Sequence, residues 1–386
     1  MRIAVIGAGA AGLLFSLLVK RRFPAWDVET FEQNPEGATY GFGVVFSDGA
    51  LAFLGRDEPA LSSVLEAAME RWPMQRLVHR GVRVDVDGNG FSAIGRLALQ
   101  EMLQALCRRS GVTIRYGRTI ASLDELAAAD LVVGADGSNS LVRTALAEQF
   151  IPGVEMLGNR FAWYGTAQPF DCLTLTFRTG THGAFVAHHY RHSPTMSTFV
   201  VECGEATWRE AGLDRMSDAD SRAYCERVFA ADLRGHGLVS NKSLWRQFPL
   251  VRNERWVARR GPSGYAVLLG DALRTVHFSI GSGTRLAFED AIALERAFAE
   301  RGDDLPRALE RFEQERRPIV EKILAAANAS SYWYEQFPEK MKLEPWQLAY
   351  DYMTRSGRMT EERLRGLAPK FMVRVDAERG GRPLPS

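Results

Sequence analysis

The sequence predicts an α/β fold in which a parallel sheet holds a dinucleotide, and three observations lead to it. A short apolar strand at residues 3–6 runs directly into a glycine-rich segment at 7–12 and an apolar helix at 13–19. A second strand at 27–31 ends at an acidic residue. Two later apolar strands, at 131–133 and 266–269, also end in loops of small residues with an aspartate. Strands that alternate with helical segments are typical of parallel sheets.

The first loop has the G-x-G-x-x-G spacing and consists of Gly7, Ala8, Gly9, Ala10, Ala11 and Gly12. Gly7 permits a tight turn, Gly9 lets the backbone approach a pyrophosphate, and Gly12 lets the helix pack close to the strand. Glu32 ends the second strand, where a carboxylate accepts hydrogen bonds from an adenosine ribose. We therefore expect this part of the chain to bind an adenine dinucleotide. A purely conformational glycine turn is the alternative.

Composition limits the class of protein. The 386 residues suffice for one large or two ordinary domains, and the net charge of +1 gives no global attraction to nucleic acid or an anionic membrane. The four cysteines are widely spaced, so neither a metal site nor a disulfide framework is expected. The apolar start of the chain carries the ordered glycine pattern and is short for a membrane span. We expect a cytoplasmic protein with no metal.

Three further segments qualify as parts of a ligand site. Residues 40–48 carry glycines beside Val44 and could press backbone against a flat ring, although a simple turn is the alternative. Arg96 begins a helix predicted over 96–109, where a surface arginine is the alternative. The two aspartates that end the later strands, Asp136 and Asp271, would lie at the carboxyl edge of the sheet, where α/β proteins bind ligands.

The middle of the chain differs in character. Residues 161–202 contain four strand-like runs rich in aromatic and β-branched residues, which predict an inserted antiparallel sheet that serves as a substrate platform. We accordingly predict a discontinuous dinucleotide-binding domain at 1–160 and 250–335. An inserted β-sheet domain follows at 161–249, and a helical C-terminal extension with a loose tail at 336–386.

The three loops, in this order, resemble those of the single-component FAD-dependent aromatic hydroxylases related to p-hydroxybenzoate hydroxylase. The resemblance covers the chain to about residue 335. It implies a Rossmann-like FAD-binding domain with an inserted antiparallel β-sheet and C-terminal helices. The residues that it assigns to FAD, besides the glycine loop and Glu32, are Gly43, Val44, Arg96, Asp136, Gly137, Asp271, Gly281, Gly283 and Thr284.

Segments at 41–48, 277–284 and 354–373 are most similar to the branch that contains salicylyl-CoA 5-hydroxylase and 2-aminobenzoyl-CoA monooxygenase/reductase. Segments at 163–166 and 195–199 are also similar to the tryptophan hydroxylase of violacein biosynthesis. Two departures matter. His277 and Phe278 stand where most of the wider family has prolines, and the fused reductase domain of the 2-aminobenzoyl-CoA enzyme has no counterpart. We therefore expect no ring reduction.

The resemblance implies hydroxylation of an activated aromatic ring through an FAD C4a-hydroperoxide, with molecular oxygen and NADH or NADPH as co-substrates. The expected substrate is an aryl-CoA thioester such as salicylyl-CoA. A free indole, a tryptophan-like compound or another free aromatic compound is the alternative. The thioester would need cations for its phosphates, for which two arginine groups, at 252–260 and 355–358, are candidates; solvated charge is their alternative.

Three side chains are candidates for positioning the substrate. His188 shares strand parity with Val186 and Tyr190, whereas His189 faces the other way. We expect His188 and Tyr190 to face the substrate, and His188 to hydrogen-bond a ring substituent, with a structural histidine as the alternative. His277 lies in the loop that the resemblance places beside the flavin, and a structural role at a helix start is its alternative.

The sequence also bears on other classes of flavoprotein. A flavin-dependent halogenase would carry a Trp-x-Trp-x-Ile-Pro motif, and the sequence has none. A flavin-dependent reductase and a non-catalytic flavin-binding module remain open on sequence alone. We expect a monomer or a homodimer that acts on a small aromatic molecule.

Overall fold

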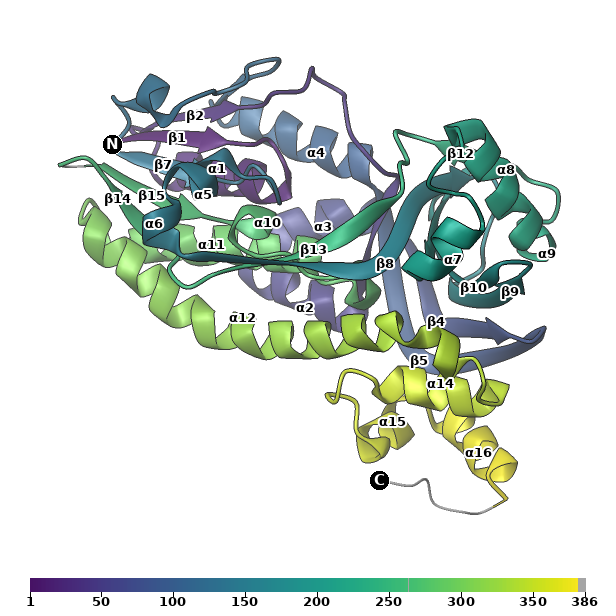
Figure 1. The fold of residues 1–386 in the computed structure, drawn as a ribbon. Coiled ribbons are helices and arrows are strands. Elements are labelled where there is room, and N and C mark those ends of the chain that lie inside the picture. Colours follow the sequence, from purple (N-terminus) through teal and green to yellow (C-terminus); the bar gives the residue numbers. More distant parts are fainter. Residues whose placement is uncertain (263, 381–386) are drawn as a thin grey trace. The chain divides into compact units, whose positions relative to one another are not determined.

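The computed structural model describes residues 1–262 and 264–380, which form two compact units (Figure 1). Unit 1 comprises Met1–Thr39, Leu97–Met156 and Pro249–Leu324. Unit 2 comprises Tyr40–Arg96, Leu157–Phe248 and the chain from Ala325 onward. Residues 40–96 therefore belong to the unit with the inserted sheet, whereas the sequence-based boundaries place them in the dinucleotide-binding domain. The reason is that their strands pair with that sheet.

Unit 1 is built on a six-stranded sheet in the order β14-β15-β7-β1-β2-β6. The strands are β14 (Val257–Arg260), β15 (Gly264–Leu268), β7 (Leu131–Gly134), β1 (Arg2–Ile6), β2 (Asp27–Phe31) and β6 (Thr113–Arg115). All neighbours are parallel except β14 and β15. Strands β1 and β7 are buried almost throughout because helices cover the sheet, which explains their continuous apolar runs.

Two helices form the main helical layer of unit 1. Helix α1 (Ala10–Arg22) packs against α11 (Gly283–Arg301), and the rings of Phe15 and Phe298 lie 6.2 Å apart between them. Residues 11–19 of α1 are all buried, so this helix is apolar on every side. The other helices of unit 1 are α4 (Arg96–Arg109, whose first residue belongs to unit 2), η1 (Leu123–Leu126), α5 (Leu141–Ala145), α6 (Ala147–Phe150), α10 (Gly270–Leu273) and η2 (Phe278–Ile280).

Unit 2 contains a nine-stranded sheet in the order β12-β8-β11-β10-β9-β4-β5-β3, with β13 also paired to β8. The strands are β12 (Leu238–Ser240), β8 (Pro152–Thr166), β11 (Met196–Cys203), β10 (Gly183–Ser193), β9 (Leu173–Gly180), β4 (Glu70–His79), β5 (Val82–Gly95), β3 (Gly43–Ser47) and β13 (Arg246–Asn253). Strands β8 to β11 lie where the sequence predicts four antiparallel runs. Strand β4 adds to β9 in parallel.

Helices cover both faces of this sheet. Helices α7 (Glu205–Glu210), α8 (Asp218–Val228) and α9 (Ala230–Leu233) cover one face over a core that includes Phe185, Phe199 and Phe229. The chain also forms α2 (Asp48–Asp57), α3 (Pro59–Ala67), α12 (Leu305–Glu335), α13 (Phe337–Lys340), α14 (Pro345–Thr354), α15 (Glu361–Leu367) and α16 (Pro369–Glu378). The C-terminal helices, yellow in Figure 1, pack on the opposite face through residues such as Phe371 and Tyr352.

Candidate functional site

The four central strands of unit 1 end in register at one edge of its sheet. Ile6 pairs with Phe31 and with Gly134, and Gly134 pairs with Leu268. The loops that follow these strands therefore start side by side at the carboxyl edge, which is the ligand-binding edge of open α/β sheets. Sequence spacing predicts this convergence, and the register of the strands produces it.

The glycine loop is shaped by close backbone contacts at two of its three glycines. Gly7 has φ of +103°, and a Cβ there would lie 2.3 Å from the carbonyl oxygen of Ala135. A Cβ on Gly12 would lie 2.0 Å from the carbonyl oxygen of Gly7. Gly9, the N-cap of α1, differs because a Cβ there would meet no atom within 4 Å. The space beside Gly9 thus suits a pyrophosphate against the helix N-terminus.

Glu32 lies directly beside this loop, as the sequence predicts. Its Oε2 accepts a hydrogen bond from the backbone N–H of Ala8 at 2.9 Å. Its Oε1 accepts from the backbone N–H of Asn34 at 2.9 Å and from Asn34 Nδ2 at 2.7 Å. A carboxylate offers about four acceptor sites, so these contacts orient Glu32 and still leave capacity for ribose hydroxyls.

Asp136 gives the clearest sign of a polar ligand in unit 1. Its Oδ2 accepts from the backbone N–H of Leu141 at 2.7 Å, whereas its buried Oδ1 has no hydrogen-bond partner in the protein. Burial raises the pKa of this carboxyl group. A buried acceptor without a partner is costly unless a ligand or solvent supplies a donor. Together with the open space at Gly9, it fits the hydroxyl-rich and phosphate-rich body of FAD, and the following Gly137 has φ of +80°.

The loop after β15 is fixed by a buried ion cluster that the sequence does not reveal. Asp290 is fully buried, and its carboxylate is paired bidentately with Arg274 at 2.7 and 2.9 Å. Arg316 approaches the same carboxylate at 3.2 Å, and the backbone N–H of Gly270 donates to it at 3.2 Å. The cluster therefore orients the loop that presents Asp271, which is exposed at the start of α10.

His277 has a structural contact in unit 1. It is 2% exposed and forms the N-cap of η2, where its Nδ1 accepts from the N–H of Ser279 at 3.4 Å. This is the alternative role that the sequence analysis keeps open for it. Gly281 follows with φ of +58°, and α11 begins at Gly283, followed by Thr284.

In unit 2, the segment around Gly43 lies tightly against the sheet. The N–H of Gly43 donates to Thr198 Oγ1 at 2.9 Å, and its carbonyl accepts from the Tyr190 hydroxyl at 2.9 Å. A Cβ at this position would lie 2.6 Å from His192 Cβ, so only glycine fits. Tyr190, predicted to face the substrate, thus supports the backbone of Gly43. Neighbouring Val44 is half-buried, and Arg96 is exposed at the start of α4.

His188 and His189 lie on opposite faces of β10, as strand parity predicts. His188 shares its face with Tyr334, whose ring centroid lies 5.0 Å away, and its Nε2 lies 3.5 Å from Glu202 Oε2. Burial and the positive charge of Arg355 lower the pKa of His188 to about 3. The imidazole is therefore neutral at physiological pH and is suited to accept a hydrogen bond.

The burial of His189 should make the free energy of unfolding depend on pH. It stacks on Phe199, and its Nε2 lies 2.9 Å from Thr176 Oγ1. Burial lowers its pKa to about 3, against about 6.5 in an unfolded chain. Between pH 6.5 and pH 3 the unfolded state therefore binds more protons than the folded state. As the pH is lowered through this range, His189 should reduce the free energy of unfolding by about 1.4 kcal/mol per pH unit. Urea unfolding at pH 7 and 5 measures it, and His189→Gln should reduce the loss; an equal loss in this variant would contradict the assignment.

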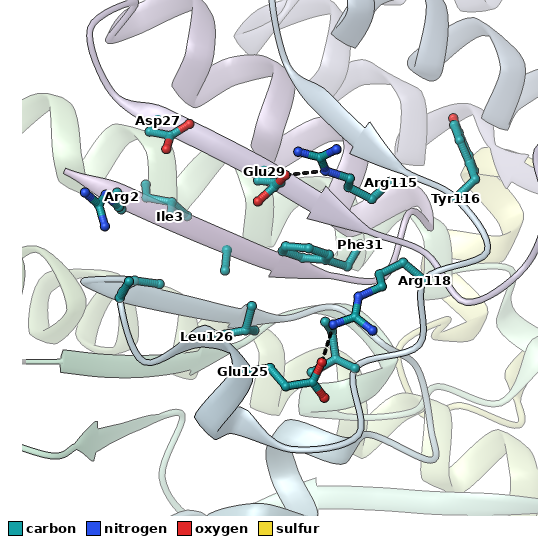
Figure 2. A pocket seen from close by; sticks show the side chains of 14 residues that line it. Arg2, Ile3, Asp27, Glu29, Phe31, Arg115, Tyr116, Arg118, Glu125 and Leu126 are labelled. Carbon is teal, nitrogen blue, oxygen red and sulfur yellow. Dashed lines mark hydrogen bonds and ion pairs between the residues drawn. The ribbon is translucent and has the colours of Figure 1, made fainter.

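A separate hollow of about 730 Å³ lies on unit 1 (Figure 2). Its lining includes the first residues of β1 and β2, and ion pairs join Arg115 to Glu29 and Arg118 to Glu125. None of the residues predicted to bind FAD lines it. Its positive and negative side chains balance each other, so we do not assign a ligand to it.

Other features bear on the predicted class of protein. Within the described residues, no helix has the length and apolarity to span a membrane, and no group of His, Cys, Asp or Glu is placed to hold a metal ion.

Arg260 donates to the backbone carbonyls of Leu123 and Ala129, which gives this arginine a structural contact. Arg252, Arg255 and Arg259 are exposed.

Comparison with known proteins places these features in context. The profile of the FAD binding domain family matches residues 101–327. A salicyloyl-CoA 5-hydroxylase from a Streptomyces species is 41% identical over 92% of this chain and 70% of its own length. Protodeoxyviolaceinate monooxygenase from Chromobacterium violaceum is 38% identical over 89% of this chain and 91% of its own length.

The fold is also found among solved structures. A mutant of 2-methyl-3-hydroxypyridine-5-carboxylic acid oxygenase superimposes with a TM-score of 0.68 over 95% of this chain and 96% of that protein. The two sequences are 18% identical, so this likeness concerns the fold alone.

Proposed function

Because this chain belongs to the FAD-dependent aromatic hydroxylases, we propose that its substrate is an aryl-CoA thioester such as salicylyl-CoA. The enzyme is a flavin monooxygenase that uses FAD, molecular oxygen and NADH or NADPH. The observation that carries the thioester proposal is the 41% identity to a salicyloyl-CoA 5-hydroxylase over 92% of the chain.

The residues at the carboxyl edge of unit 1 would hold the cofactor. The backbone beside Gly9 would meet the pyrophosphate, Glu32 would accept from the ribose, and Asp136 Oδ1 would accept from a hydroxyl or N–H of FAD. When bound, the flavin supplies an electrophilic oxygen atom that originates from molecular oxygen. The protein need only position the ring and exclude water around that reaction.

The sheet face that carries His188 is the proposed substrate face. Phe161 and Trp163 of β8 pair with Glu202 and Val200 of β11, and they share this face with His188. Aromatic and apolar walls of this kind exclude water, and a neutral His188 can hydrogen-bond a hydroxyl or amino substituent. We propose that His188 orients the substrate ring in this way. For the CoA phosphates, the proposed contacts are either the exposed Arg252, Arg255 and Arg259 or the exposed Arg358.

A free aromatic substrate is the second candidate. The observation that favours it is the 38% identity to protodeoxyviolaceinate monooxygenase, whose name carries no CoA group. An assay of NADH and NADPH oxidation across paired free acids and CoA thioesters, with mass spectrometry for a gain of one oxygen atom, separates the candidates. Hydroxylation of free acids or amines alone would overturn the thioester proposal, and product without an atom from labelled oxygen gas would overturn the hydroxylase assignment.

His188→Ala should lower the yield of hydroxylated product per NAD(P)H oxidised more than it lowers flavin content. Loss of a positioning hydrogen bond leaves the ring misplaced, so more of the activated oxygen is lost as hydrogen peroxide. We expect the ratio of product to peroxide to fall about tenfold, because one hydrogen bond to a ligand is worth about 1 kcal/mol or slightly more. Product and peroxide are quantified together; an unchanged ratio would contradict the role.

Two further proposals concern the state of the protein. All four cysteines are buried and free, and burial raises the pKa of the Cys107 thiol to about 12. Unreactive free thiols support a reducing compartment, and we propose the cytoplasm.

We propose that the protein is a monomer or a homodimer. Sedimentation of the FAD-loaded protein would distinguish these two states.

A further inference from the structure

A buried carboxylate stands next to His188 on the proposed substrate face. Glu202 of β11 is 1% exposed, and its Oε2 lies 3.5 Å from Nε2 of His188. In the strand register, His188 pairs with Val200 and Val186 pairs with Glu202. The two side chains are therefore diagonal neighbours on one face of the sheet, within reach of each other.

Asn159 fixes the position of this carboxylate. Its Nδ2 donates to Glu202 Oε1 at 2.8 Å and to the carbonyl oxygen of Tyr334 at 2.8 Å. Both hydrogens of the amide are thereby used, so the amide cannot turn away from Glu202. The backbone N–H of Asn159 donates to Glu335 Oε1 at 3.0 Å, which anchors the same stretch of β8. Glu202 is thus held in one orientation, with its second oxygen toward His188.

We propose that His188 and Glu202 form a proton relay that ionises the substituent of the substrate ring, an inference that rests on the proposed function. The O–H or N–H bond of the substituent breaks, and its proton passes to Nδ1 of His188. At the same time Nε2 of His188 and Oε2 of Glu202 close from 3.5 Å to hydrogen-bond distance, and the proton on Nε2 passes to Oε2. The electron pair of the broken bond remains on the substrate, where it is shared with the ring.

The step balances without a further reactant. One negative charge leaves Glu202 and appears on the substrate, and His188 is neutral before and after. The ring becomes more electron-rich, which is what attack on an electrophilic oxygen atom requires. His188 touches the substrate and is the catalytic residue of the pair, whereas Glu202 acts through it as a positioning and proton-accepting residue.

The surroundings of the pair favour a relay over a charged histidine. The groups that face it are Tyr334 and Glu335 from α12, Tyr352 from α14 and Arg355 just after α14. Arg355 stacks on Tyr352, with its guanidinium carbon 3.6 Å from the ring centroid, and brings a positive charge to this side. Burial and that charge lower the pKa of His188. A lasting imidazolium is therefore disfavoured, and the proton must move on to Glu202.

Two variants, one at Glu202 and one at His188, each block one proton transfer of the relay and keep a side chain of similar size in place. Glu202→Gln retains an oxygen for Asn159 but cannot receive a proton. His188→Gln retains an N–H that can reach Glu202 but cannot pass a proton through. Glu226→Gln is the matched control, since it removes a carboxylate that accepts the backbone N–H of Leu238 at 2.6 Å and lies on α8, on the opposite face of the sheet from His188.

The test uses full-length, FAD-loaded protein with two phenols, salicylyl-CoA and 4-nitrophenol. Ionisation of the bound phenol is followed without oxygen by ultraviolet and visible difference spectra across a pH series, and turnover is followed in air. In Glu202→Gln we expect the bound phenol to ionise at a pH about one unit higher, with kcat lowered about tenfold. In His188→Gln we expect a loss of about a hundredfold in kcat. Glu226→Gln should keep the wild-type profile.

The outcomes separate the two proposals. Wild-type ionisation profiles in both relay variants, or an equal shift in Glu226→Gln, would overturn the relay and leave these side chains a packing role. Failure of the wild-type enzyme to hydroxylate any aromatic compound would overturn the proposed function. That second result is obtained from the wild type alone, and the ionisation measurement does not depend on turnover.

Discussion

Gly9→Val should yield a folded protein that emerges from purification without its yellow colour. Gly9 has φ of −81° and ψ of −175°, a conformation open to any residue, and a Cβ there meets nothing within 4 Å. The protein fold therefore tolerates a side chain that the FAD pyrophosphate would not. We expect FAD affinity to fall about a hundredfold, equivalent to about 2.8 kcal/mol. Flavin absorbance per protein measures the loss of FAD, and circular dichroism measures whether the fold is retained.

Two glycine variants calibrate that result. Gly366→Val places the same side chain in an exposed, open position of α15 and should keep the wild-type flavin content. Gly12→Val should lose the fold as well as the flavin, because its Cβ would lie 2.0 Å from a backbone oxygen. A yellow Gly9→Val protein with wild-type affinity would show that the pyrophosphate does not lie against this loop.

Asp290→Ala should reduce the free energy of unfolding of the flavin-free protein by about 3–5 kcal/mol. The substitution removes the carboxylate that pairs with Arg274 and Arg316, which are 3% and 5% exposed, and only Arg316 keeps a second carboxylate, that of Glu289 at 3.0 Å. It also removes the acceptor of the Gly270 N–H. Urea unfolding followed by circular dichroism gives the difference.

An exposed ion pair in the same unit provides the control for Asp290. Glu300 lies 3.4 Å from Arg311, and their side chains are 42% and 38% exposed. Glu300→Ala should therefore change the free energy of unfolding by less than about 1 kcal/mol. A loss below 1 kcal/mol in Asp290→Ala would mean that the cluster does not hold the Gly270 loop.

Much of the carboxyl edge of the unit 1 sheet could be predicted from sequence because its signals are local. The Gly7 turn, the position of Glu32 at the end of the second strand and the strand that precedes Asp136 each follow from a few consecutive residues and their known backbone geometry. The four strands β8 to β11 were equally predictable, since alternating β-branched and aromatic residues mark them. The opposite orientations of His188 and His189 followed from strand parity alone.

The remaining features depend on pairings between distant segments. Residues 40–96 join the second sheet because β3 pairs with β5 and β4 with β9, and no local pattern indicates this. No local pattern indicates that the Tyr190 hydroxyl donates to the backbone carbonyl of Gly43, which is far away in the sequence. Glu202 ends an ordinary predicted strand, and only the approach of Asn159 shows that its carboxylate is buried and held.

The cluster of Arg274, Asp290 and Arg316 also constrains how this protein can diverge. Glu289, which lies 3.0 Å from Arg316, balances the charge of this buried group, and exchanging one of the three alone would disturb that balance. Related proteins should therefore change these positions together or not at all. Covariation among the three in an alignment of relatives would record that restriction. Substitutions designed to alter the loop that presents Asp271 should therefore leave all three residues unchanged or replace them together.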